Sequence, residues 1–341
     1  MILGSLFGKK ELVSIDPGTI NVKIVSGTKE KNNVRINNFG LASFNVEKVD
    51  SSHIFEENLY YLINTSLTSL KIKSKNFIFT IPINFSFFTN FTLPRINEKN
   101  LPTAIKFEAQ RFLPIDVNES VYGYRYFLQE IAGEESRYLV FFLSTPKSYI
   151  QKIEKVVKML SGKLLKIDSE VWALEKYFLN SLENFVLVDV GHNNSLIIGY
   201  VYGKTLFAKK VIIGGNILVS NLSQTLKVNK QRTIMHLQER GFYFPPEESD
   251  LKNISEIFIK NLCEEVKRNI SDFENIAVGK ISKIYWTGGL ATYKGFLEKV
   301  TQNIPEYLNS LLNPADLLGG DKFSQLKEKS NFFSVAAGAL I

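Results

Sequence analysis

Two short polar stretches, each at the end of an apolar segment, contain residue types that bind phosphate groups. Asp16-Pro-Gly-Thr-Ile-Asn follows the apolar start of the chain, and Asp189-Val-Gly-His-Asn-Asn-Ser follows Val186 and Val188. A glycine in such a turn, at a position that favours positive φ, lets consecutive backbone N–H groups point into one concavity. A carboxylate at the strand end is placed to hold a metal ion, usually through water.

Either stretch alone also fits a glycine-containing β-turn with a hydrogen-bonding aspartate. Because both lead straight back into a predicted strand, they indicate an internal duplication, and the repetition favours phosphate binding. Asp16 and Asp189 are the predicted metal-positioning residues. The residues assigned to this site are Asp16, Gly18, Thr19, Asn21 and Lys23 in the first stretch and Asp189, Gly191, Asn193, Asn194 and Ser195 in the second.

Two further segments could complete the site. One is a predicted helix on which a carboxylate, two cations and a hydroxyl share a face and could bracket a ribose and a purine: Glu264, Lys267, Arg268 and Ser271. The alternative is a solvated face with internal ion pairs. In the other segment, Gly288 and Gly289 join a predicted strand to a helix, where a ligand could approach the backbone closely.

The elements that must position these residues form two similar halves. Three strands in meander are predicted at 11–15, 21–26 and 34–44, and three more at 186–190, 195–202 and 205–213. Between the halves, residues 83–166 follow the order β-α-β-β-α-β, which predicts a self-contained α+β unit inserted into the first domain.

Length and composition exclude several classes of protein. A chain of 341 residues with 45% hydrophobic residues can bury two or three domain cores. A single cysteine, Cys263, excludes a disulfide framework, and three histidines without metal-ligand spacing make a zinc site a poor interpretation. These features fit a reducing, intracellular setting.

The net charge of +7 favours acidic partners such as anionic lipid or nucleic acid. No run of five or more basic residues occurs, so we expect a generally lysine-rich surface instead. No apolar stretch reaches 18 residues, which predicts that the chain does not cross a membrane. The N-terminus, apolar and then basic, is the reverse of a signal peptide.

The ordered set of loops resembles the actin-like ATPase superfamily, and the helix face at 264–271 is similar to the purine-binding helix of DnaK-type chaperones. Within the superfamily the chain resembles the PilM family of type IV pilus assembly over essentially its whole length. The segments that carry this resemblance are "FEAQRFLPIDVNESVYGYRYF", "LFAKKVIIGGN" and an N-terminal "LFGKK".

The resemblance implies an α/β fold: a duplicated two-domain, actin-like (ribonuclease H-like) architecture with an inserted α+β subdomain, an SHS2 domain. The implied divisions are domain 1A over 1–82, the inserted subdomain 1C over 83–166, a connecting helix of domain 1A over 167–184, domain 2A over 185–227, a helical subdomain 2B over 228–280, and the rest of domain 2A with a return helix over 281–341.

The resemblance also implies that ATP and Mg bind in the cleft between the two halves, with Glu170 as the residue that orients a water. The family's loops usually carry small residues. Pro17, Ile20 and His192 are larger here, so we expect slow ATP hydrolysis at most.

The expected function is a cytoplasmic scaffold, peripheral to the inner face of the membrane, that recruits the N-terminal tail of a single-pass, PilN-like protein. It would bind no nucleic acid and not insert into the membrane; self-association is left open. In the inserted unit, Leu101, Ile105, Ala109 and Phe112 form one apolar stripe. Phe107 and Arg111 lie off that stripe and are the predicted partner-binding residues, although Phe107 could instead pack on neighbouring strands.

Three other functions use the same fold. An FtsA-like division protein usually ends in an amphipathic membrane helix, whereas this sequence ends in "SVAAGALI", the fold's own last helix. A small-molecule kinase needs a general base facing its acceptor hydroxyl, and no aspartate in a Gly-rich acceptor loop is found in the first half. A DNA-segregation filament protein has only the positive charge in its favour.

Overall fold

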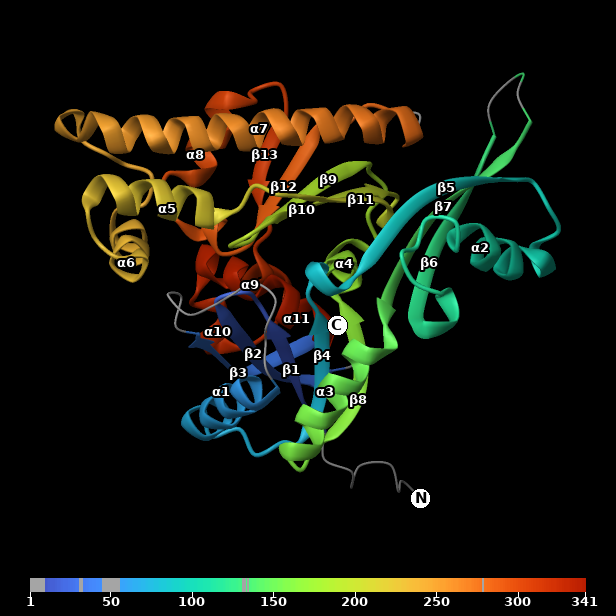
Figure 1. Ribbon diagram of the computed structural model, residues 1–341, viewed down its shortest axis with the longest axis horizontal. Coiled ribbons are helices and arrows are strands. Elements are labelled where there is room, and N and C mark those ends of the chain that lie inside the picture. Colours follow the sequence, from blue (N-terminus) through green and yellow to red (C-terminus); the bar gives the residue numbers. More distant parts are fainter. Residues whose placement is uncertain (1–9, 31–32, 45–55, 131–132, 134, 278) are drawn as a thin grey trace. The chain divides into compact units, whose positions relative to one another are not determined.

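A computed structural model describes residues 10–341 except 31–32, 45–55, 131–132, 134 and 278 (Figure 1). The predicted "LFGKK" segment therefore lies outside the described residues apart from Lys10. The chain forms two compact units, the first from residues 1–82, 152–177 and 311–341 and the second from 83–151 and 178–310.

Unit 1 is built on a five-stranded sheet with the order β3-β2-β1-β4-β8. The first three strands are antiparallel, and β4 and β8 are parallel to β1. The strands are β1 (Glu11–Pro17), β2 (Asn21–Lys29), β3 (Val34–Ser43), β4 (Asn76–Ile81) and β8 (Lys163–Ser169); the helices are α1 (Glu56–Ser69), α4 (Glu170–Glu175), α9 (Pro314–Leu317), α10 (Asp321–Ser324) and α11 (Ser334–Leu340).

Unit 2 contains a second sheet with the same arrangement, β11-β10-β9-β12-β13, which confirms the predicted duplication. Its strands are β9 (Phe185–Val190), β10 (Ser195–Val201), β11 (Lys204–Val211), β12 (Lys283–Thr287) and β13 (Leu308–Leu311). Its helices are α5 (Gly215–Leu226), α6 (Lys230–Arg240), α7 (Ser249–Ala277) and α8 (Phe296–Asn303). The likeness extends to detail, since a register shift occurs at Gly27 in β2 and at Gly199 in β10.

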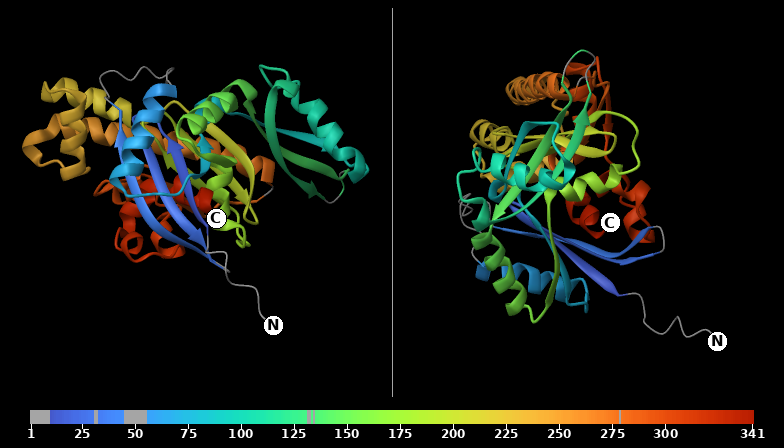
Figure 2. Two further views of the ribbon diagram at one scale, coloured as in Figure 1. Left: turned by 90° about the horizontal axis from the view of Figure 1, so that it is seen from below. Right: turned by 90° about the vertical axis from the view of Figure 1, so that its right-hand side faces the viewer.

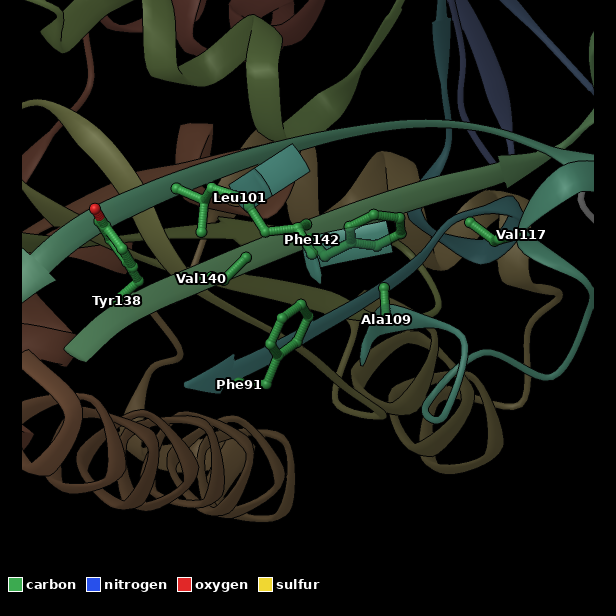
Figure 3. Packing of buried hydrophobic residues seen from close by; sticks show 8 residues of the cluster. Phe91, Leu101, Ala109, Val117, Tyr138, Val140 and Phe142 are labelled. Carbon is green, nitrogen blue, oxygen red and sulfur yellow. The ribbon is translucent and has the colours of Figure 1, made fainter. Parts of the chain in front are cut away.

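The inserted subdomain is a three-stranded antiparallel sheet, β5-β7-β6, with α2 on one face (Figures 1 and 2). Its elements are β5 (Phe87–Pro94), α2 (Leu101–Ala109), β6 (Ser120–Gln129) and β7 (Arg137–Pro146). Leu101, Ile105 and Ala109 are buried against Phe91 and Phe142, as the apolar stripe predicts (Figure 3). Phe112 is half-exposed and stacks on Phe91, because α2 ends before it.

Two predicted elements differ from the structure. The last strand expected in the insertion, β8, pairs in parallel with β4 and therefore belongs to the sheet of unit 1. The helix α3 (Lys147–Met159) that precedes it continues from the inserted subdomain into unit 1. The connecting helix expected over 167–184 is limited to α4 and a 3₁₀ turn at Lys176–Phe178, because Asp168 and Ser169 still continue strand β8.

The two connecting segments, α4 and α11, pack closely in unit 1. A Cβ at Gly338 would lie 2.3 Å from the carbonyl oxygen of Ala173, so only glycine permits this approach. Lys176 Nζ donates to the carbonyl oxygens of Gly338 and Ala339 at 3.1 and 2.9 Å and pairs with Asp168 at 2.8 Å. Burial lowers the pKa of Lys176 to about 8, against the opposing effect of Asp168.

Candidate nucleotide-binding loops

The first loop connects β1 to β2 in unit 1. Gly18 donates its backbone N–H to the carbonyl oxygen of Asn21 at 2.8 Å, and Thr19 lies half-buried inside this turn. Asp16 stands directly opposite Lys23 in the antiparallel register, and neither belongs to the turn itself. The hairpin therefore places the Asp16 and Lys23 side chains together at its base.

Asp16 is fully buried, and both of its carboxylate oxygens have protein partners. Lys23 Nζ lies 2.8 Å from Oδ2, and the hydroxyl of Thr80 donates to Oδ1 at 2.8 Å. Lys23 thus holds a positive charge where the sequence predicted a metal ion. A metal near Asp16 would therefore share the carboxylate with Lys23 and Thr80.

The second loop connects β9 to β10 in unit 2 and rests on the first turn of α5. The N–H groups of Gly215 and Asn216 donate to the carbonyl oxygens of Gly191 and His192 at 3.0 and 2.7 Å. Gly191 in turn donates to Asn194 at 3.2 Å, and Asn193 lies half-buried in the turn. The start of α5 therefore fixes the shape of the loop.

The first glycine of the "IGGN" segment makes this packing possible. A Cβ at Gly214 would lie 2.4 Å from the carbonyl oxygen of His192 and 2.7 Å from the backbone nitrogen of Asn194. Real Cβ atoms essentially never approach backbone atoms so closely, so Gly214 is required by the proximity of the loop. The sequence predicts that "GGNILVSNL" caps and starts a helix, which α5 confirms, but it does not reveal this close approach to the loop.

Asp189 and Gly288 meet at the ends of two neighbouring strands. Thr287 pairs with Asp189 in the parallel β9–β12 register, and Gly288 follows with φ +94. A Cβ at Gly288 would lie 2.3 Å from Asp189 Oδ1, so glycine is required there both by φ and by space. The structure thus brings together the second loop and the predicted Gly288-Gly289 segment.

Three expectations about these loops need correction. Gly18 and Gly191 do not have positive φ; Gly191 is needed because a Cβ would lie 2.7 Å from the Asn194 carbonyl oxygen. Gly289 leads into a three-residue 3₁₀ turn, and α8 begins only at Phe296. Ser195 is fully buried, and its hydroxyl donates to the Ile213 carbonyl oxygen at 2.6 Å, so this side chain stabilises the loop from inside.

His192 is neutral in this environment. Burial, together with the positive charge of Lys230, lowers its pKa to about 4. Lys230 Nζ also donates to Asn216 Oδ1 at 3.2 Å. The second loop therefore has an uncharged imidazole and a nearby ammonium group, an arrangement that favours an anion over a cation. Lys230 was not predicted, because it lies on α6, far from both motifs in the sequence.

The charged helix face lies where the spacing predicts it. Glu264, Lys267, Arg268 and Ser271 are all on the exposed side of α7. The three charged residues are engaged in surface ion pairs: Lys267 with Glu306 at 2.7 Å, Arg268 with Glu265 at 2.8 Å, and Glu264 with Lys260 at 3.9 Å. Such exposed pairs are weak and can be exchanged for a ligand at little cost.

The remaining predicted residues are in unit 1 and in the inserted subdomain. Glu170 is half-buried and begins α4, after the N-cap Ser169. Phe107 is 77% exposed, which excludes the alternative that it packs on neighbouring strands. Arg111 is also exposed and forms an ion pair with Glu108 at 2.8 Å.

Hydrogen bonds inside unit 2 connect the inserted subdomain to the second loop and its sheet. Asn194 Nδ2, in the loop, donates to Asn84 Oδ1 at the entry to the subdomain, at 3.0 Å. Asn90 on β5 donates to the Leu206 carbonyl oxygen, and Gln129 on β6 to that of Ile276 at 3.2 Å. These bonds are not predictable from the sequence, because single asparagine and glutamine residues form no distinctive pattern.

The side chains near these loops fit a hydrated magnesium ion bound together with a nucleotide better than a metal ion held by protein ligands alone. Among the described residues, no group of three or more His, Cys, Asp or Glu side chains could hold a metal ion. Magnesium commonly keeps several waters and uses one or two carboxylates plus phosphate oxygens, which Asp189 could satisfy. Across the same residues, no helix has the length and apolar character needed to cross a membrane.

The duplicated five-stranded sheets, with glycine-containing loops at matching strand ends, define a protein of the actin-like ATPase fold. A family model described as type IV pilus assembly protein PilM matches residues 14–340. The chain belongs to this PilM family. None of the curated proteins matches it.

Several solved structures resemble this one. A PilM–PilN type IV pilus biogenesis complex has 14% identity and a TM-score of 0.76 over 98% of both chains. The ethanolamine utilization protein EutJ from Carboxydothermus hydrogenoformans has 15% identity and a TM-score of 0.57, covering 98% of this chain and 90% of that one. MreB5 of Spiroplasma citri bound to AMPPNP has 10% identity and a TM-score of 0.53, covering 98% and 96%.

Proposed function

We propose that this protein is a cytoplasmic, ATP-binding scaffold that recruits the cytoplasmic tail of a PilN-like membrane protein during type IV pilus assembly. The observation that carries the proposal is the second loop, whose backbone conformation depends on Gly214 and Gly288 and which carries Asp189 at its edge. Membership of the PilM family supports the assembly role.

In unit 2, Gly191, Asn193 and Asn194 would hold phosphate oxygens, with Gly288 and Gly289 beside them. In unit 1, Gly18, Thr19 and Asn21 form the matching candidate phosphate loop. The face formed by Glu264, Lys267, Arg268 and Ser271 would hold the nucleoside. Asp189 would position Mg through water. The Asp16–Lys23 pair would supply a fixed positive charge from Lys23. Bound Mg-ATP would supply a phosphate chain, and its presence would distinguish the nucleotide-bound protein from the nucleotide-free protein.

Hydrolysis is proposed to be slow or absent. Pro17, Ile20 and His192 fill space near the loops that small residues leave open, and neutral His192 is a weak base at its lowered pKa. Glu170 remains the candidate for orienting a water. A slow or absent turnover suits a scaffold whose states depend on nucleotide occupancy.

Asp189→Ala is expected to weaken Mg-ATP binding by about tenfold or more, because groups that position a metal through water commonly contribute that much. Calorimetric titration with ATP, in magnesium and in EDTA, measures the loss. Asp189→Asn is the matched variant: it preserves the shape against Gly288 and removes only the charge. Equal binding by wild type and both variants would contradict the proposed role, and no ATP binding by wild type at millimolar concentration would contradict nucleotide binding itself.

The tail is proposed to bind at the inserted subdomain, on the surface that carries Phe107 and Arg111. An exposed phenylalanine is an anchor for apolar side chains of an extended peptide. The hydrogen bond from Asn194 to Asn84 would let the second loop influence this subdomain. The similar PilM–PilN complex supports a PilN-like partner.

Phe107→Ala or Arg111→Glu is expected to weaken the tail several-fold without lowering stability. Phe107 contributes little to the core, and the exposed Arg111–Glu108 pair contributes at most about 0.5 kcal/mol. Fluorescence anisotropy with a labelled peptide from the N-terminal tail of a PilN-like single-pass protein measures the effect. Tyr61→Ala, on α1, removes a comparably exposed aromatic side chain and is the control. Wild-type affinity in both test variants would place the tail on another surface.

A further inference from the structure

Two turns in unit 1 lie side by side at one end of its sheet. One follows α1 and leads into β4, and the other follows α3 and leads into β8 (Figure 1). The backbone N–H of Lys163 donates to the carbonyl oxygen of Lys75 at 2.8 Å, which joins the two turns. Each helix ends near a residue with positive φ, Lys71 after α1 and Ser161 after α3.

Lysines are concentrated in these turns and in the parts of α3 and β8 next to them. Residues 70–75 and 152–166 contain eight lysines and one glutamate, a net charge of +7, and the whole chain has the same formal charge of +7. The rest of the chain is also rich in lysine and arginine, but its acidic residues balance them in number. The sequence shows no run of basic residues here, because apolar residues separate the lysines and because two distant segments contribute to the cluster.

Part of this charge is already neutralised. Lys155 lies 3.9 Å from Glu56, and Lys166 lies 2.7 Å from Asp168. Lys71, Lys73, Lys75, Lys158 and Lys163 are all exposed, and within the described part of the chain none of them forms an ion pair. We call these five lysines the basic end.

Two apolar side chains lie among the lysines. Met159, the last residue of α3, is 43% exposed, and Leu165 in β8 is 40% exposed. Leu165 lies two residues from Lys163 on this edge strand, at the position where the register of β8 against β4 shifts. Exposed apolar groups beside lysines are typical of surfaces that rest on lipid headgroups.

We propose that the basic end binds the surface of an anionic phospholipid membrane without inserting into it. Lysine clusters attract anionic headgroups as point charges, and Met159 and Leu165 would enter the headgroup region. A nucleic acid site would instead use arginine forks and aromatic stacking, and the basic end contains neither. This contact is additional to recruitment through a partner and does not depend on it.

The full-length protein is tested by sedimentation with vesicles of phosphatidylglycerol and phosphatidylcholine, and with phosphatidylcholine alone. At about 0.1 M salt, where screening acts over roughly 10 Å, wild type should sediment only with the anionic vesicles. Because each lysine near such a surface raises the affinity about fivefold, the triple variant Lys73→Glu, Lys75→Glu and Lys163→Glu should partition at least about tenfold more weakly. High salt should release wild type.

A matched variant separates position from net charge. The control is a second triple variant, with Lys322→Glu, Lys327→Glu and Lys329→Glu. It makes the same charge change on other exposed residues of unit 1 and should bind the vesicles nearly as well as wild type. Equal losses in both triple variants, or no vesicle binding by wild type, would overturn the proposal. Tight binding of duplex DNA that depends on the basic end, with no vesicle binding, would assign the surface to nucleic acid instead. Thermal unfolding confirms that the variants are folded.

Discussion

Asp16→Ala is expected to lower the free energy of unfolding of unit 1 by about 3 kcal/mol, since removing one partner of a buried ion pair leaves the other charge uncompensated. Asp16 has no exposed surface, and the side chain of Lys23 is only 17% exposed. The substitution also deprives the Thr80 hydroxyl of its acceptor. Urea denaturation gives the overall loss, and hydrogen exchange of peptides from β1 and β2 shows whether unit 1 is the part that opens.

A second substitution distinguishes a structural ion pair from a metal site. The double variant Asp16→Ala and Lys23→Met removes both charges, so it should recover much of the stability lost in Asp16→Ala. If Asp16 mainly positions a metal, Asp16→Ala should leave the stability of the free protein unchanged and reduce only Mg-ATP affinity. No recovery in the double variant would show that the pair itself is not the source of the stability.

The sequence predicted the fold well where the pattern is local. Alternating apolar residues identified the first three strands of each sheet, and the repeated turn after Asp16 and Asp189 identified the duplication; the short edge strand β13 was not predicted. The stripe of Leu101, Ile105 and Ala109 correctly predicted the buried face of α2, and with it the exposure of Phe107. Each of these predictions depends on residues a few positions apart.

Predictions that depended on distant partners were less accurate. The sequence pattern of β8 predicts a strand, but it does not reveal which sheet the strand joins. In the structure β8 pairs with β4 of unit 1, outside the inserted sheet. The role of Gly214 depends on the backbone of residues 192–194, and the basic end depends on the adjacency of Lys75 and Lys163. The pairing of Asp16 with Lys23 could have been read from the hairpin register, because the turn fixes which residues face each other.

Gly214→Ala is expected to have the largest effect on the candidate site. The added Cβ would meet the His192 carbonyl oxygen at 2.4 Å, the Asn193 carbonyl carbon at 2.5 Å and the Asn194 nitrogen at 2.7 Å. These are backbone atoms held by the first turn of α5, so they cannot rotate away as a side chain would. Overpacking of this kind costs about 1–3 kcal/mol, and here it also displaces the residues proposed to hold phosphate.

Two other glycines are controls for this variant. A Cβ at Gly215 would meet the Leu290 side chain at 3.1 Å and the Gly191 carbonyl oxygen at an ordinary 3.8 Å, and one at Gly279 would meet the Asn184 amide at 3.4 Å. Thermal unfolding and ATP titration should therefore show a severe loss for Gly214→Ala, a small one for Gly215→Ala and none for Gly279→Ala. Backbone conformation is not the cause at Gly214, because its φ of −145 and ψ of 172 are accessible to any residue. Wild-type stability and ATP affinity in Gly214→Ala would mean that the second loop can move off α5, and the rigid phosphate site proposed here would be wrong.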